Sequence, residues 1–427
     1  MRRYLHVLKT TDFRGLWLGA TISTLGDGMT FVALCWLVLS RPGGTAQLGL
    51  LGVCYTAPVL LGGLAVGPLL DRFDKRTVFI ADSLLRAFVV ASVPLTAAFD
   101  ATPTWLPFAV AAVYGSLKMV PLAGFPAAIP QLVNEADLDP ANALESLSFS
   151  LASVVGPAAA GLLITQIGAA NVLLVDSATF LVFAIAVARI RRPLRPTAAA
   201  TTAAASTTAA TAVDGAAADA KPPSLLGLAR DRLIVATTIA FMAFNIAEGM
   251  LLVTAPWLAK NHLPGGAAAL GVLLSALAAG EIVGATFAGQ HQPRRSRVRA
   301  IGLVQAAAAV SFLALLATPD QLLVGMGFFA LGLLSAPMTV WAQSLRMRRI
   351  PPALHGRAFA TLRTLMQATP PLGSALATPL LVRDQLTIAA ITMTVIAGLP
   401  GLYLILAITD RAQTPAADGS LSKPQAR

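Results

Sequence analysis

Long apolar stretches dominate this sequence and decide what it can fold into. A stretch of about 20 mostly apolar residues is long enough to cross a bilayer as a helix, and in lipid each span must satisfy its own backbone hydrogen bonds. The sequence therefore predicts an all-α membrane protein with twelve transmembrane helices. Their approximate cores are residues 16–39, 47–70, 78–98, 105–130, 143–166, 171–190, 234–258, 267–289, 300–318, 321–344, 357–381 and 386–408.

The distribution of basic residues predicts how these spans are oriented. Of the 31 lysines and arginines, 25 fall in segments that an even, up-and-down path places on the same side as the N-terminus. Because Lys and Arg accumulate in cytoplasmic loops, both termini are expected in the cytoplasm. The net charge of +11 therefore reflects topology. Nucleic-acid binding is not expected, since the basic residues are spread over short loops.

A segment rich in Ala and Thr divides the chain into two parts with six spans each. We expect an N-terminal bundle at 1–190, a flexible cytoplasmic linker at 191–231, a C-terminal bundle at 232–409 and a cytoplasmic tail at 410–427. The linker assignment rests on its composition, its proline-bearing ends and its lack of apolar periodicity.

An internal repeat is also indicated by the glycines of the two parts. At an offset of 217 residues, Gly63 in the second span matches Gly280 in the eighth, and Gly156 in the fifth matches Gly373 in the eleventh. A shared offset in separate segments favours duplication of a six-helix unit.

The charged loop after the second span, within "GPLLDRFDKRTVF", resembles a signature of the major facilitator superfamily. That signature is G-x-L-x-D-R-x-G-R-K, and together with two sets of six spans it implies the major facilitator fold. Asp74 departs from it by replacing a glycine, although Asp tolerates the left-handed turn that glycine usually serves. The matching residues are Gly67, Leu69, Asp71, Arg72, Lys75 and Arg76.

The resemblance implies that this loop helps to hold the cytoplasmic side closed. Asp71 would point at the N-terminus of the eleventh span, near 355–357, where free N–H groups and the helix dipole favour an anion. Lys75 would pair with Glu135 or Asp137 at the end of the fourth span. In the alternative interpretation the loop is only a topological stop of positive charge, which explains its basic residues but not Asp71.

Three further segments narrow the resemblance to a branch of drug exporters. "FRGLWLGATISTLGDGMTFVAL", "NALESLSFSLASVVGPAAAGLLI" and "IPPALHGRAFA" are similar to the branch that includes macrolide efflux proteins and the enterobactin exporter. Gly156, Pro157 and Gly161 match part of its antiporter signature. This resemblance implies export of small molecules.

Charged side chains inside the predicted spans are candidates for substrate or proton binding. A charge at the bilayer centre costs about 2.5–3.5 kcal/mol on insertion scales, so it indicates function by default. In the resembled family, the first, fourth, seventh and tenth spans line one central cavity. The midspan candidates on these helices are Asp27, Lys118 and Glu248, with Asn245 one turn before Glu248.

The chemistry of these residues leaves two interpretations open. A poorly hydrated cavity favours the neutral form of a carboxylate, so Asp27 or Glu248 can take up a proton, which a neighbouring Lys118 would oppose. Binding of a cationic drug and of a proton would then compete. Alternatively, Asp27 and Lys118 form a fixed ion pair that only holds two spans together.

The remaining polar residues in the spans receive weaker assignments. Glu281 lies deep without an evident partner, so a functional and a packing role are equally open. Asp82 and Arg86, four residues apart with the acid first, are expected to form a structural pair within one helix. Trp341 is expected to face the cavity.

Three charged residues are assigned to positions nearer the ends of spans, where snorkelling of the side chain or one contact between helices is enough to accommodate the charge. They are Glu145, Asp176 and Arg363, of which Arg363 is the best candidate for gating.

Together these features predict a secondary transporter of the bacterial inner membrane. We expect a monomer without cofactors that exports amphipathic small molecules by alternating access, in exchange for protons. A siderophore exporter and a lysophospholipid flippase of the same fold are the alternatives. An enzyme is not expected, because the chain lacks H-E-x-x-H and G-x-S-x-G and its four histidines fall outside the spans.

Overall fold

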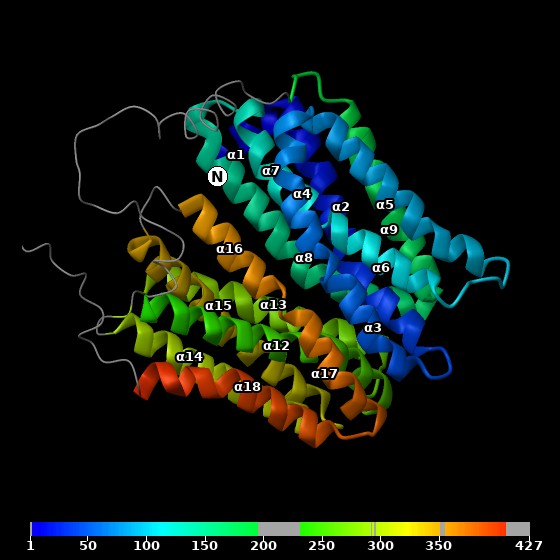
Figure 1. Cartoon of the computed structure of the whole chain (residues 1–427). Helices are drawn as coiled ribbons and strands as arrows, with labels where there is room; N and C mark the ends of the chain where they lie inside the picture. The colour runs from blue at the N-terminus through cyan, green and yellow to red at the C-terminus, as the bar shows by residue number, and fades with distance from the viewer. Residues whose placement is uncertain (1, 195–230, 292, 294–295, 351–354, 407–427) are drawn as a thin grey trace, which may run out of the picture.

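The computed structural model describes residues 2–194, 231–291, 293, 296–350 and 355–406. Their regular secondary structure is entirely helical, and Figure 1 shows two groups of helices, α1 to α9 and α12 to α18. The fold is thus all-α with two helical bundles, as predicted. Most of the predicted linker and the whole predicted tail lie outside the described residues, so these two assignments stay predictions.

The first bundle contains nine α-helices and one short 3-10 helix. They are α1 (Arg2–Lys9), α2 (Thr11–Leu39), α3 (Gly44–Thr56), α4 (Pro58–Arg72), α5 (Lys75–Ala97), α6 (Leu106–Leu117), α7 (Met119–Leu132), η1 (Glu135–Asp137), α8 (Leu138–Ile167) and α9 (Ala169–Ala188). The chief packing partners are α2 with α8 and α9, and α5 with α9.

The second bundle repeats this scheme. Its helices are α12 (Arg232–Asn261), α13 (Ala267–Gln290), α14 (Arg297–Ser311), η2 (Phe312–Ala317), α15 (Gln321–Arg349), α16 (His355–Gln367), α17 (Pro370–Val382) and α18 (Leu386–Leu406). Helix α12 packs against α17 and α18, α13 against α15, and α14 against α18.

Eleven helical stretches in the described part of the chain are long and apolar enough to cross a membrane. The predicted span at 357–381 is the exception, because it is divided into α16 and α17 at Ala368 and Thr369. Pro370 occupies the first turn of α17, where its missing N–H costs nothing. The second span is divided into α3 and α4 before Pro58, but Ala57 keeps helical angles of φ −63° and ψ −41°, and Gly44–Leu70 still forms one stretch long enough to cross the membrane. The interruption of the predicted span at 357–381 is therefore the larger of the two.

Equivalent glycines allow the fifth span of each bundle to pack closely against the first span. A side chain at Gly156 in α8 would come within 3 Å of the Cα of Gly28 in α2, and one at Gly373 in α17 would collide with the backbone of Ile246 in α12. Close approach of two backbones requires glycine. These two glycines are the pair that the predicted repeat relates.

The two bundles meet closely at one end, which we call the far end because it lies opposite the basic loops. Here Lys260 Nζ, at the end of α12, donates to the backbone oxygen of Leu39 at the end of α2. A side chain at Gly161 in α8 would collide with the backbone of Ala267 in α13. These contacts join the two bundles at the far end.

The other end of the bundles, which carries the basic loops, is called the basic end. Helix α4 leads into the charged loop at this end; its Leu61 is 69% and its Leu64 66% exposed, and a Cβ added at Gly67, in its basic-end half, would meet no atom within 4 Å. In the last turn of α16, next to the break before α17, Leu365 is 44% exposed. The part of α4 around Gly67 is therefore less covered than the far-end contacts.

Candidate functional site

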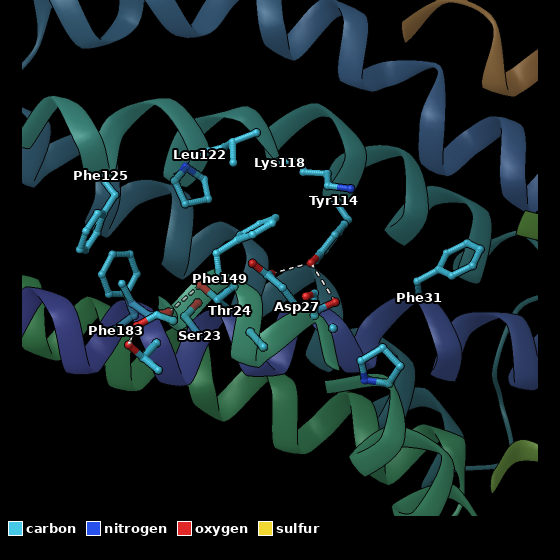
Figure 2. A pocket seen from close by; sticks show the side chains of 18 of the residues that line it. Ser23, Thr24, Asp27, Phe31, Tyr114, Lys118, Leu122, Phe125, Phe149 and Phe183 are labelled. Carbon is cyan, nitrogen blue, oxygen red and sulfur yellow. Dashed lines mark hydrogen bonds between the residues drawn. The ribbon is translucent and has the colours of Figure 1, made fainter. Parts of the chain in front are cut away.

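A cavity of about 390 Å³ lies mainly within the first bundle. Most of its lining comes from α2, α6, α7 and α8, and the second bundle adds Leu252 and Leu274. Figure 2 shows Phe125 and Phe183 at one end, Phe31 at the other, and Asp27 between them. A concave, mostly apolar site with a few polar groups is typical of small-molecule binding. The aromatic lining residues are Trp17, Phe31, Tyr55, Tyr114, Phe125, Phe149 and Phe183.

Asp27 in this cavity pairs with Arg86, not with Lys118. Its Oδ1 accepts hydrogen bonds from Tyr114 Oη at 2.5 Å and from Arg86 Nη1 at 3.3 Å. Lys118 Nζ instead lies 5.4 Å from the centre of the Tyr55 ring. The interpretation of Asp27 and Lys118 as a fixed ion pair is therefore wrong. The sequence did not indicate this ion pair, because Arg86 already had an apparent partner in Asp82, one turn earlier in the same helix.

Arg86 is the centre of a buried charged cluster behind the cavity. Its side chain is 1% exposed, and its Nε lies 3.1 Å from Asp82 Oδ2, which is the intrahelical pair that we predicted. Asp82 Oδ1 is buried without a hydrogen-bond partner among the described residues. Arg86 therefore joins two carboxylates, Asp82 in its own helix and Asp27 in α2.

Asp176 belongs to the same region and is not near a span end as we expected. It is completely buried, accepts a hydrogen bond from Thr30 Oγ1, and lies so close to Gly26 that a side chain there would collide with it. Gly26 directly precedes Asp27, so α2 brings the two carboxylates into one neighbourhood. The sequence showed that Asp176 is a charged residue within an apolar helix, but it did not show how deeply this residue is buried.

A second cavity, of about 400 Å³, lies within the second bundle. Glu248 from α12 and Glu281 from α13 both line it, as does Asn245, whose Nδ2 donates to the backbone oxygen of Met366 at 3.1 Å. None of the described residues that line it is basic. Glu281 thus faces the same space as Glu248, which the sequence did not indicate.

The expectation of one shared cavity is wrong for this structure. Asp27 and Lys118 line the first cavity, and Glu248 lines the second. The three residues therefore fall in two cavities, one mainly within each bundle. Leu252 and Leu274 of the second bundle cover the first cavity from the other side.

Trp341 faces neither cavity, contrary to our expectation. It is 8% exposed, and its indole Nε1 donates to the backbone oxygens of Ala288 at 3.3 Å and His291 at 3.2 Å. These acceptors are at the end of α13, where carbonyl groups lack helical partners. Trp341 therefore fastens α15 to the end of α13.

The charged loop between α4 and α5 has a local structural role. Asp74 is extended, with φ −60° and ψ 123°, so its position is not the left-handed turn that we expected of the signature glycine. It caps α5 by accepting the N–H of Arg76 at 2.8 Å. The guanidinium of Arg76 donates to the backbone oxygen of Ala188 at the end of α9, whereas Arg72 is exposed.

The predicted partners of this loop are not joined in the structure. Lys75 is 7% exposed and forms no ion pair with Glu135 or Asp137 in the described part of the chain, and Asp137 instead lies 3.8 Å from His6. The side chains of Asp71 and of residues 355–357 lie outside the described set. Arg363 is exposed on α16. These contacts were expected only when the bundles close at the basic end.

The antiporter-like segment of α8 forms a seam between helices. Gly156 faces α2 of its own bundle. The backbone oxygen of the next residue, Pro157, abuts Gly271 of α13, and Gly161, one turn along, faces Ala267 of the same helix. Pro157 and Gly161 therefore lie where the first bundle packs on the second, whereas Gly156 packs α8 on α2.

Comparison with known proteins agrees with this architecture. Residues 4–426 match the family described as transmembrane secretion effector. The chain is 27% identical over 367 residues to the multidrug efflux pump Tap of Mycolicibacterium fortuitum, covering 83% of this chain and 85% of that protein. It is 22% identical over 368 residues to macrolide efflux protein A of Streptococcus pyogenes, covering 84% of this chain and 87% of that protein.

Solved structures with the same fold are more distant in sequence. A POT family transporter in complex with 5-aminolevulinic acid has a TM-score of 0.72 at 13% identity, covering 94% of this chain and 96% of that chain. A D-xylose-proton symporter has a TM-score of 0.66 at 12% identity, covering 94% and 99%. The predicted resemblance is confirmed, and the chain belongs to the transmembrane secretion effector family of major facilitator transporters, which are not enzymes.

Proposed function

We propose that this multi-pass membrane protein exports amphipathic small molecules from the bacterial cytoplasm in exchange for protons. The observation that carries the proposal is the pair of carboxylates, Glu248 and Glu281, in a cavity whose described lining holds no basic residue. Relatives over most of the chain are named as drug and macrolide efflux proteins. The aromatic lining of the first cavity suits the apolar body of such compounds.

The proton coupling follows from electrostatics. Two negative charges that share a cavity of about 400 Å³ within the membrane repel each other and lose solvation. Binding a proton to Glu248 or Glu281 removes one of these charges without any counter-ion. A cavity that opens in turn to either side of the membrane would then pick up protons on one side and release them on the other.

Alternating access is supported by the unequal contacts at the two ends. The bundles are fastened at the far end, through Lys260 and the α8–α13 seam, and less covered at the basic end. By the positive-inside rule the basic end and both termini face the cytoplasm of the bacterial inner membrane. This arrangement suits loading from the cytoplasm.

Both cavities are built from one chain, so we propose that a monomer is sufficient.

Transport by inverted membrane vesicles tests the proposal. With an imposed pH gradient, acid inside, we expect vesicles that contain the protein to accumulate a fluorescent amphipathic compound, and a protonophore to abolish the accumulation. A pump-deficient host that expresses the chain should also become less susceptible to several amphipathic drugs. Equal accumulation in vesicles with and without the protein, for every compound of the panel, would refute export.

We propose that the loop at 67–76 holds the basic end closed in the state of the transport cycle in which the far end is open. Asp71→Asn removes a charge–dipole attraction of about 0.3–2 kcal/mol, so the closed state should weaken. We expect maleimide to label a cysteine at the exposed position Leu64 several-fold faster, in a background without Cys35 and Cys54. Asp139→Asn, in the first turn of α8, is the matched control. Unchanged labelling with normal transport would leave the loop only a topological role.

A further inference from the structure

We infer that the first cavity selects amphipathic compounds that carry an anionic group, and that Lys118 binds this group. The inference rests on the proposed export function and names the class of substrate that the cavity accepts. It reverses the expectation that an acidic residue in the cavity would bind a cationic drug.

The amino group of Lys118 is the one basic group among the described residues that line the cavity. Lys118 lines the cavity and is exposed within it, and it forms no ion pair with a carboxylate in the described part of the chain. Its nearest recorded neighbour is the face of the Tyr55 ring, 5.4 Å from Nζ. A charge at this depth without a direct ion pair is costly, so a bound anion would stabilise it.

Backbone contacts fix the position of Lys118 beside the cavity. Lys118 stands at the break between α6 and α7, where its N–H bonds to the oxygen of Gly115 at 3.3 Å, three residues back. Gly115 in turn lies against the backbone oxygen of Tyr55 in α3, so closely that a side chain would collide. The turn that carries Lys118 is therefore held against α3, beside the ring that the amine faces.

One carboxylate oxygen of Asp27 is already engaged by protein groups, which makes Asp27 a poorer site for a cation. Its Oδ1 already accepts from Tyr114 Oη and from the guanidinium of Arg86. Asp82 and Asp176 are buried behind the wall and do not line the cavity. The other acidic residue of the lining is Glu145, in the second turn of α8 and thus toward the basic end. The deep part of the cavity therefore presents an aspartate that is ion-paired with Arg86 and a lysine that has no direct ion pair among the described residues.

The shape of the cavity indicates how the compound lies. In Figure 2, Lys118 lies beside Tyr114, between Phe31 at one end and the pair of Phe125 and Phe183 at the other. A volume of about 390 Å³ accommodates a drug-sized molecule. A flat apolar body would lie among the phenylalanines toward the basic end, with a carboxylate or phenolate reaching Lys118. The inferred substrate class is an aromatic organic anion.

Two probes with the same ring and opposite charge test this inference. Pyrenebutyrate and pyrenebutyl-trimethylammonium share the pyrene body, and energy transfer from Trp17, which lines the cavity, reports their binding to the purified protein. We expect pyrenebutyrate to bind at least about tenfold more tightly, the range of a hydrogen bond to a charged group. A Trp17→Phe variant identifies the part of the transfer that arises in the cavity.

Substitutions at Lys118 assign the preference to this residue. Lys118→Gln should weaken pyrenebutyrate binding by about tenfold or more while the trimethylammonium probe binds equally or more tightly, and Lys118→Arg should retain the preference. Lys9→Gln removes an equal charge from exposed α1 and should change neither affinity. Size-exclusion profiles and melting temperatures show whether each variant is folded.

Three results would overturn the inference. They are equal or tighter binding of the cationic probe to the wild-type protein, an unchanged affinity of Lys118→Gln for pyrenebutyrate, and failure of both probes to bind. The vesicle assay separates this failure from failure of the proposed function. Export of the cationic probe alone would refute anion selection but leave export intact, whereas export of neither probe nor any panel drug would refute both.

Discussion

Glu248→Gln is expected to reduce pH-gradient-driven efflux to the background of vesicles that lack the protein. The amide has the shape of a protonated carboxyl group but cannot release a proton, so the exchange stops after substrate binds. Glu281→Gln should reduce coupled efflux as well, because both carboxylates line one cavity without a basic partner. Initial rates of efflux in vesicles with equal amounts of protein provide the measurement.

A second assay separates lost coupling from a damaged protein. Exchange of labelled for unlabelled substrate across the vesicle membrane needs no net proton movement, so both variants should retain it. Asp384→Asn, in an exposed loop at the far end, is the matched control and should keep gradient-driven efflux. If both glutamine variants keep efflux with an unchanged pH profile, neither glutamate carries the proton and another energy source must be sought.

Arg86→Met is expected to cause the largest loss of stability among single substitutions. The guanidinium is 1% exposed and joins Asp27 and Asp82, so its removal leaves two carboxylates without their cation. Removing one partner of a buried ion pair costs about 3–5 kcal/mol. The arginine also lies over the ring of Tyr114, at 5.0 Å from its centre, a contact that methionine would lose in part. The melting temperature of the purified protein should fall markedly.

A compensating substitution distinguishes charge from packing in this cluster. In Arg86→Met combined with Asp82→Asn, one stranded charge disappears, so part of the lost melting temperature should return. Arg383→Met, in the exposed turn after α17, is the control and should melt like the wild type. A wild-type melting temperature for Arg86→Met, or no recovery in the double variant, would show that the ion pairs do not stabilise the bundle.

The bends in the helices were only partly visible in the sequence. Proline lacks an N–H, which suits the first turn of a helix, and Pro58 and Pro370 each begin a helix, although Ala57 and Thr369 before them keep helical backbone angles. However, prolines also lie inside continuous helices, such as Pro157 in α8 and Pro337 in α15. Neighbouring helices can re-satisfy the freed backbone groups in a membrane, so proline alone does not predict a break.

The sequence by itself determined the number of spans, the family and the identity of the buried charged residues. Bilayer thickness sets the length of a span, and the cost of charge in lipid makes residues such as Glu248 conspicuous. Only the tertiary structure decided which charges meet: Asp27 with Arg86, Glu248 with Glu281, and Lys118 with the face of Tyr55 and not in a direct ion pair among the described residues. The physical reason is that both the lipid-facing and the packed sides of a membrane helix are apolar. The sequence therefore carries little amphipathic signal for how each helix is rotated toward its neighbours.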